Sequence, residues 1–315
     1  MAGRGIILAL GLALHASAMA QTPPPFLPPR TQNGHPDFQG VWSSRWLTPL
    51  ERESADLPLA LSQEQAVALE ARIRARQQRP TNLCPETANW EGPLAVVRGE
   101  IRSSLIVDPP DGKLPYGPAG KAANDAWSKD FGAPGASDPE SRVRVERCIS
   151  GVGWAPLQIR SSAMLHQIVQ TGDHVVLHTE AYSDLRIIPL DRAPPVREVL
   201  TPTSESVARW EGDTLVVETT RLDAKNAVRG LVIVMSADAK VTEWFTLLSP
   251  DQLLYRYTVD DPAFYSRPWT VEYVMLRSSE RIYEFACHEG NYSLANILSG
   301  ARRMEQPTAA KAVKN

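Results

Sequence analysis

The sequence predicts a mainly β protein whose antiparallel meander closes into a barrel, lipocalin-like in shape, or folds over as a sandwich. From residue 158 onward, short apolar runs alternate with polar positions, a pattern that is typical of strands with one buried face. The connectors between these runs are short and rich in turn-forming residues, as in Gly172-Asp173, Glu211-Gly212-Asp213 and Ser249-Pro250-Asp251. Tight connectors join antiparallel neighbours, and a long meander must close or fold over to cover its edge strands.

The N-terminus predicts export to the periplasm or secretion. Arg4 precedes an apolar run from Ile6 to Leu14, and Ala18-Met19-Ala20 places small residues where a signal peptidase cuts. This run is too short for a bilayer span, which needs roughly 20 apolar residues. We therefore expect residues 1–20 to be removed as a signal peptide, and the mature chain to contain no membrane span.

Composition narrows the class of partner. The full chain has 33 Lys and Arg against 36 Asp and Glu, and removal of Arg4 gives the mature chain a net charge of −4. A nucleic-acid-binding protein presents a basic footprint instead, so nucleic acid is not an expected partner. Hydrophobic residues make up 43% of the chain, which is enough for a packed core.

Shifts in composition divide the chain into parts. Residues 22–30 are rich in proline, which fixes φ and lacks a donor, so they cannot enter a helix interior or a central strand. A long stretch rich in Pro, Gly, Asp and Asn follows the first helix and is expected to wrap over the core. The expected parts are a signal peptide (1–20), a Pro-rich arm with a short aromatic segment (21–60), a helix plus loop-rich wrapping region (61–157), a β-rich core with a terminal helix (158–303) and a flexible tail (304–315).

Two helices and one early strand are predicted outside the meander. Ser62 and Gln65 form a capping box, which opens a helix that ends near Gln78. Ser293 is the expected N-cap of the terminal helix, which carries basic residues in its last turn. An isolated strand is expected at residues 104–107. The meander itself is predicted to consist of strands near 165–170, 174–181, 185–190, 206–210, 214–220, 231–235, 241–248, 253–259, 269–277 and 281–287.

Three cysteines remain after the signal peptide: Cys84, Cys148 and Cys287. In an oxidising compartment two of them are expected to pair. We favour a Cys148–Cys287 disulfide, because Cys84 lies in a loop that contains Pro and Asn. A metal site at Cys287-His288 is the alternative, but adjacent ligands without a second spaced pair are a weak signal, so no metal is predicted.

Several long motifs occur together in the β-rich part. They are Arg186-Ile-Ile-Pro-Leu-Asp191, Arg209-Trp-Glu-Gly-Asp-Thr-Leu-Val-Val-Glu-Thr219, Ser266-Arg-Pro-Trp-Thr270 and Tyr283-Glu-Phe-Ala-Cys-His-Glu-Gly-Asn-Tyr292. With these motifs the chain resembles, over residues 33–303, a large and mostly uncharacterised family of exported bacterial proteins. The resemblance implies architecture and compartment rather than an activity.

The chain departs from the pattern of that family at two places. Ser183-Asp184 stands where the family pattern has a His-Asp pair, and Asp191-Arg-Ala-Pro-Pro195 stands where it has Asp-Gly-Arg-Pro-His. If those histidines are catalytic in relatives, this member has lost or changed the chemistry.

The predicted catalytic group is built around His288, whose intrinsic pKa suits proton transfer near neutral pH. His288 closes the last expected strand, a position from which a side chain can project over the mouth of a barrel. Asp184, Arg186 and Glu218 are charged residues within apolar strands, where a charge must be solvated or paired. They are expected to act as charge partners of His288 or as structural pairs. Arg256 with Glu243 or Glu272 is a further expected structural pair.

Aromatic side chains are the predicted ligand contacts. They are Trp210, Trp244, Tyr255, Tyr257 and Trp269, expected to line an apolar cavity. The phosphate loop, the dinucleotide fingerprint, the Gly-x-Ser-x-Gly elbow and the His-Glu-x-x-His zinc motif do not occur in the sequence. No cofactor is therefore predicted.

These observations lead to two main functional hypotheses. The first is an exported enzyme that acts on a small, mostly apolar organic molecule by cofactor-independent acid/base chemistry, of the isomerase, lyase or cyclase type. The alternative is a non-catalytic, lipocalin-like protein that binds such a molecule. An accessory protein of the envelope, docked to a partner through the Pro-rich arm, is a third hypothesis.

Overall fold

A computed structural model describes residues 26–77, 92–130, 138–139, 142, 144–149, 153–157, 165–191, 205–222, 228–229 and 233–305. The predicted signal peptide, Cys84 and most of the expected tail lie outside these residues. Among the described helices, none is both long and apolar enough to cross a membrane.

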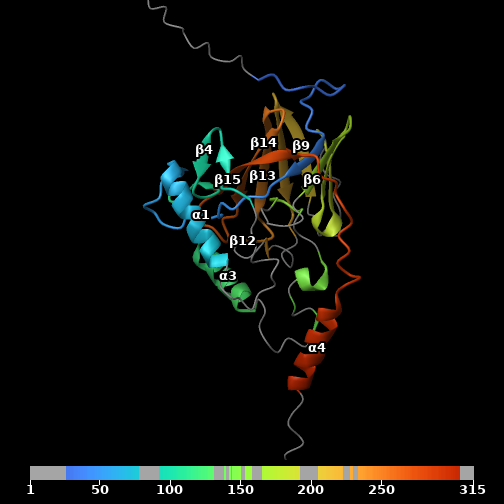
Figure 1. Ribbon diagram of the computed structural model, residues 1–315. Coiled ribbons are helices and arrows are strands. Elements are labelled where there is room, and N and C mark those ends of the chain that lie inside the picture. Colours follow the sequence, from blue (N-terminus) through green and yellow to red (C-terminus); the bar gives the residue numbers. More distant parts are fainter. Residues whose placement is uncertain are drawn as a thin grey trace, which may run out of the picture.

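A ten-stranded antiparallel sheet forms the body of the molecule (Figure 1). Its strands run in the order β8-β7-β6-β1-β15-β14-β13-β10-β9, and β5 also pairs with β15. The mainly β, antiparallel architecture predicted from the sequence is therefore confirmed. The strands are β1 (Gly40–Ser43), β5 (Ile106–Asp108), β6 (Leu165–Gln170), β7 (His174–Thr179), β8 (Asp184–Pro189), β9 (Glu205–Glu211), β10 (Thr214–Thr220), β13 (Lys240–Ser249), β14 (Gln252–Asp260) and β15 (Trp269–Ser278).

Smaller elements surround this sheet. The three-stranded sheet β2-β4-β3 and helix α1 lie together at one side of the main sheet, and α4 lies below it (Figure 1). Their bounds are β2 (Ala60–Leu61), β3 (Val96–Val97), β4 (Glu100–Arg102), β11 (Val228–Arg229), β12 (Ile233–Val234), α1 (Gln63–Gln77), α3 (Pro118–Asp130), α4 (Tyr292–Glu305), and the 3-10 helices η2 (Arg144–Arg147) and η3 (Ala181–Ser183).

Strand β1 makes the strand order non-sequential. It comes from the aromatic segment near the N-terminus and lies between β6 and β15, with Trp42 opposite His166 on one side and Arg277 on the other. Trp42 is fully buried, and its indole N–H donates to the Phe38 carbonyl at 2.8 Å. A segment far from the meander in the sequence thus joins its two halves.

The predicted strand at 281–287 is wrong. Residues 281–286 have no regular structure, and Cys287 begins a turn. Strand β15, which precedes this segment, has β14 along one edge and β1 and β5 along the other. No edge of β15 is therefore left for a following hairpin strand, and the chain leaves the sheet.

The predicted closure into a barrel is not found in the described residues. The ladder is open between its end strands β8 and β9, whose described backbone contact is an isolated parallel bridge between Leu190 and Ala208. At this bridge the Asp191 amide donates to the Ala208 carbonyl at 2.9 Å. The strand-connecting residues 192–204 lie outside the described part of the chain.

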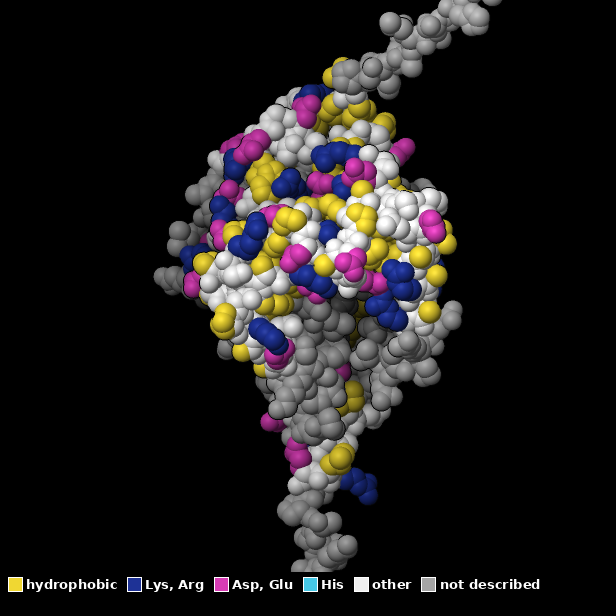
Figure 2. All heavy atoms as spheres, turned by 90° about the vertical axis from the view of Figure 1, so that its left-hand side faces the viewer, with side chains coloured by type: hydrophobic (Ala, Val, Ile, Leu, Met, Phe, Trp, Pro, Cys, Tyr) yellow, Lys and Arg dark blue, Asp and Glu magenta, His cyan; other side chains and the backbone are white. Residues whose placement is uncertain are grey.

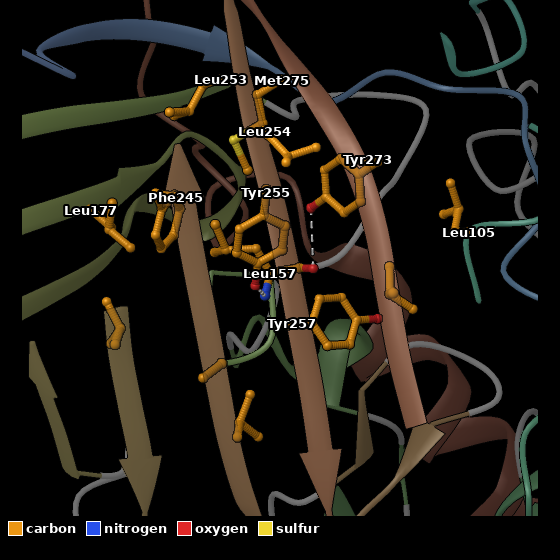
Figure 3. Packing of buried hydrophobic residues seen from close by; sticks show 14 of the residues in the cluster. Leu105, Leu157, Leu177, Phe245, Leu253, Leu254, Tyr255, Tyr257, Tyr273 and Met275 are labelled. Atoms are coloured by element: carbon orange, nitrogen blue, oxygen red, sulfur yellow. Dashed lines mark hydrogen bonds between the residues drawn. The ribbon is translucent and has the colours of Figure 1, made fainter. Parts of the chain in front are cut away.

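A short irregular segment, residues 153–157, packs against the inner side of the curved sheet. Its Leu157 amide donates to the Tyr255 hydroxyl at 2.8 Å, and the Tyr273 hydroxyl donates to the Leu157 carbonyl at 3.3 Å. Figure 3 shows Leu157 beneath these two rings, on neighbouring strands β14 and β15. Trp154 and Leu157 are almost completely buried. This part of the inner face is therefore covered by the chain itself.

The predicted capping box is confirmed and the predicted terminal cap is wrong. The Gln65 amide donates to the Ser62 hydroxyl at 3.2 Å, and the Ser62 amide donates to the Gln65 side chain at 2.9 Å. At the start of α4, the Leu294 amide donates to the Asn291 side chain at 3.4 Å, so Asn291 takes the place expected for Ser293. Both Asn and Ser are strong N-caps, and the helix begins earlier than the sequence suggested.

The Cys148–Cys287 disulfide is confirmed, with 5.7 Å between the two Cα atoms. It fixes the segment that follows β15 to the residue after η2. The Asn291 side chain adds a hydrogen bond to the Glu146 carbonyl at 2.7 Å. The Arg45 guanidinium forms two hydrogen bonds with the Glu280 carboxylate, both 3.0 Å, where the segment leaves the sheet.

Burial of His166 predicts acid sensitivity of the fold. Its ring nitrogens lie 3.1 Å from the Ser44 hydroxyl and 2.9 Å from the Thr179 hydroxyl, and burial lowers its pKa from 6.5 to about 4. The folded state therefore binds fewer protons than the unfolded state between these values. Stability should be complete above pH 6.5 and fall as the pH drops toward 4, by about 2–3 kcal/mol from this residue alone.

Urea unfolding at pH 7 and pH 4.5 measures this loss. In His166→Gln the difference between the two pH values should shrink by about 2 kcal/mol, whereas His178→Gln, on the half-exposed face of β7, should keep it. Equal pH dependence in wild type and His166→Gln would contradict the assignment.

Candidate functional site

The four predicted catalytic residues lie in three different places. Asp184 and Arg186 are buried on the inner face of β8. Glu218 lies on the outer face of β10, and Arg209 and Lys240 outweigh its partial burial and lower its pKa. His288 is exposed in the turn that begins at Cys287. The structure therefore does not assemble these residues into one group.

Arg186 is the centre of a buried polar network that spans the interior of the sheet. Its guanidinium forms two hydrogen bonds with the Glu243 carboxylate, at 3.0 and 2.5 Å. The Tyr255 hydroxyl donates to the same carboxylate at 2.7 Å. Ser206 and Thr219 add contacts to Arg186 at 3.4 and 3.3 Å. The expected pairing of Glu243 with Arg256 is therefore replaced by a pairing with Arg186.

Electrostatics in this network follow from burial. Burial opposes the charge of Arg186, but the Glu243 carboxylate outweighs this effect and raises the Arg186 pKa. Burial, with the Glu243 charge added, raises the pKa of Tyr255 well above its usual value. Arg186 therefore stays charged and Tyr255 stays neutral at physiological pH, so neither is suited to exchange a proton.

Asp184 has a structural role next to this network. One of its carboxylate oxygens accepts the Gly153 amide at 2.8 Å. A β-carbon placed on Gly153 would lie 2.6 Å from the Asp184 Cβ atom and 2.7 Å from the Thr179 hydroxyl oxygen. Only glycine fits at this contact, so the chain fills the space beside Asp184 that a substrate would need.

The five predicted ligand-binding aromatics do not line a common cavity. Tyr255, Tyr257 and Trp269 are buried and pack on one another, with ring centroids 5.6 and 5.8 Å apart. Trp210 stacks on the His35 ring at 4.7 Å, near the rim of the sheet. Trp244 is half-buried on the opposite, outer face of β13. Of the five, only Trp244 borders the pocket described next.

A pocket of about 200 Å³ lies on the outer face of the sheet. Its floor consists of two neighbouring cross-strand rows. One row is Trp244 opposite Arg256 and Arg256 opposite Glu272, and the other is Thr214 opposite Thr246 and Thr246 opposite Leu254. The β3–β4 hairpin adds Arg98 to the lining. Strands that are distant in sequence thus bring an indole, an aliphatic side chain, two hydroxyls and three charges together.

Arg98 occupies a backbone conformation that its side chain does not favour. It has a φ of +50° in the two-residue turn Arg98-Gly99, where Gly99 has a φ of +84°. Such turns favour Asn-Gly, and a non-glycine residue there costs on the order of 1 kcal/mol. The guanidinium of Arg98 lies 3.6 Å from the Glu272 carboxylate, so the turn directs a positive charge toward the pocket. Strain at a ligand site is a recurrent feature of functional residues.

Arg256, like Arg98, is an exposed cation of the pocket. Its guanidinium carbon lies 5.9 Å from the centre of the Trp244 ring. Among the described residues no carboxylate lies within 4.0 Å of it, because Glu272, its cross-strand neighbour, contacts Arg98 and Arg102 instead. Figure 2, which faces the side of α1 and β4, shows positive and negative side chains interspersed over the described residues. Arg256 combines the lack of an acidic partner with an indole ring beside it.

Only some residues of this pocket could have been predicted from the sequence. Alternation along β13 could have separated Trp244 from Glu243, because neighbouring residues of a strand face opposite sides. Arg98 could not have been found, since its place depends on the packing of a separate hairpin.

Among the described residues, no group of three or more His, Cys, Asp or Glu side chains could hold a metal ion.

The buried network predicts a large loss of stability when one partner changes. Glu243→Gln should lower the free energy of unfolding by about 3 kcal/mol or more, since it leaves the Arg186 charge buried without compensation. Glu218→Gln, a matched change in an outer-face ion pair, should cost less than about 1 kcal/mol. Urea unfolding at pH 7 measures both. Equal effects of the two variants would contradict the role of the Arg186–Glu243 pair.

Comparison with known proteins yields no match to a family model, a curated protein or a solved structure. The interpretation of the pocket thus comes from its own geometry.

Proposed function

We propose that the protein is an exported, non-catalytic binding protein for a small organic molecule, and that the pocket at Trp244 and Arg256 is its binding site. The observation that carries this proposal is Arg256, an exposed guanidinium next to an indole ring and without an acidic partner among the described residues. Binding sites typically combine an apolar surface with a few polar groups that orient the ligand. This pocket has both.

The size of the pocket limits the ligand. Ligand pockets usually enclose roughly 300–1,000 Å³, and this one has about 200 Å³. We therefore propose that a single-ring molecule, or a terminal group of a larger one, occupies this pocket. Trp244 and Leu254 supply its apolar contacts, and the Thr214 and Thr246 hydroxyls, 2.8 Å apart, each retain hydrogen-bonding capacity for it.

The geometry favours binding over the acid/base enzyme that the sequence also suggested. That enzyme requires His288 to work with Asp184, Arg186 or Glu218. His288 is exposed beside the disulfide, whereas Asp184 and Arg186 are buried and already paired. Proton transfer needs groups within hydrogen-bond reach of one bound substrate.

Export, barrel shape and family membership belong to the same proposal. The signal-like N-terminus and the Cys148–Cys287 disulfide support an oxidising compartment, since disulfides persist there. The Leu190–Ala208 bridge between the end strands supports a barrel that closes through this contact. The motifs at residues 186–191 and 209–219 support membership of the family of exported bacterial proteins that the chain resembles.

Ligand-observed NMR with a panel of single-ring molecules, including benzoate, benzamide and cyclohexanol, tests the location of the site. Trp244→Ala should weaken the binding of any molecule that binds the wild type by about tenfold or more, because the indole provides much of the apolar contact. Trp210→Phe is the matched control on the inner face and should leave affinity within about twofold. Weaker binding in Trp210→Phe with unchanged binding in Trp244→Ala would place the ligand inside the sheet and refute the proposed site.

A further inference from the structure

We infer that the ligand carries a carboxylate next to a flat apolar ring, bound by Arg256 and Arg98 on the one side and by Trp244 and Leu254 on the other. This inference rests on the proposed binding function and names the chemical class of the ligand.

The charges around the pocket leave one positive charge without a partner. Three arginines, Arg98, Arg102 and Arg256, lie around two carboxylates, Glu100 and Glu272. Arg102 contacts Glu100 at 2.8 Å and Glu272 at 3.5 Å, and Arg98 contacts the other oxygen of Glu272 at 3.6 Å. Both carboxylates are therefore engaged by arginines other than Arg256. A ligand with a single negative charge balances the remaining cation.

The hydrogen-bonding capacity of the pocket also indicates a ligand with a carboxylate. Arginine side chains only donate, and the oxygens of Glu272 already face Arg98 and Arg102. Apart from the two threonine hydroxyls, the pocket thus offers donors and few free acceptors. A neutral sugar ring needs acceptors for its hydroxyl protons, whereas a carboxylate needs donors alone. The planar guanidinium also matches the two oxygens of a carboxylate.

The apolar part of the ligand follows from the arrangement of the floor. Trp244 and Leu254 lie in adjacent cross-strand rows, and both border the pocket, with Leu254 the more deeply buried of the two. The guanidinium carbon of Arg256 lies 5.9 Å from the centre of the indole ring, so a carboxylate bound to it places the attached ring beside Trp244 and Leu254. A single ring matches the volume of the pocket, about 200 Å³.

The strained turn supports the assignment of Arg98 as the second cation. A stable hairpin would place Asn before Gly99, and Asn cannot reach Glu272 or a ligand with a positive charge. Arg98 keeps an unfavourable φ and holds its guanidinium at the edge of the pocket, 3.6 Å from Glu272. A carboxylate bound at Arg256 lies within reach of this second guanidinium.

Isothermal titration calorimetry with benzoate and benzamide separates the charge from the ring. Wild type should bind benzoate at least about tenfold more tightly than benzamide, a difference of about 1.4 kcal/mol. Arg256→Gln should remove this preference, and Arg256→Lys should retain only part of it, since an ammonium cannot form the planar pair of hydrogen bonds. Arg209→Gln removes one positive charge from another ion pair on the outer face and should retain the preference.

Arg98→Asn tests the second cation without risk to the fold. Asn suits the turn better than Arg, so the melting temperature should stay the same or rise, while the preference for benzoate falls several-fold. If the wild type binds benzoate and benzamide equally and Trp244→Ala binds neither, the inference of a carboxylate ligand is refuted and the proposed site is retained. Failure of both probes to bind the wild type would refute the inference, and failure of the whole panel would also refute the proposed function.

Discussion

The ion pair between Arg186 and Glu243 connects strands that lie far apart in the order of the main sheet. Arg186 belongs to β8, an end strand, and Glu243 belongs to β13. Two charges without access to water require each other and the surrounding hydroxyls, because an unpaired buried charge is strongly destabilising. The pair therefore favours a curvature of the sheet that brings the inner faces of β8 and β13 toward each other. The segment at 153–157 packs against this inner side, where its Leu157 amide donates to the Tyr255 hydroxyl, whereas the pocket at Trp244 and Arg256 lies on the outer face.

Local sequence signals predicted the elements well and their connections less well. The bounds of β6 and β10 and the capping box at Ser62 depend on residues close in sequence, and these predictions are confirmed. The insertion of β1 between β6 and β15 depends on contacts across more than half of the chain, which no local pattern encodes. The same insertion occupies the edge of β15 that a strand at 281–287 would have needed.

The candidate site illustrates a different limit. The predicted aromatics were grouped by residue type, but the faces of a sheet are assigned by alternation and by register between strands. Tyr255 faces the interior, and Trp244, on the neighbouring strand, faces the pocket. The assignment of these two side chains to opposite faces depends on the strand register, in which Trp244 lies opposite Arg256. The contribution of Arg98 required knowledge of how a separate hairpin packs, which a single sequence does not contain.

The Cys148–Cys287 bond also has a consequence for the order of events during synthesis. Ribosomes make a chain from its N-terminus, so Cys84 and Cys148 are both available before Cys287, which is 139 residues beyond Cys148. The native partner of Cys148 is thus the last cysteine to appear. The thiol of Cys148 must either wait until almost the whole sheet has been made, or exchange an earlier bond for the native one through attack by a thiolate. Oxidation of this pair therefore marks a chain that is complete through its last strand.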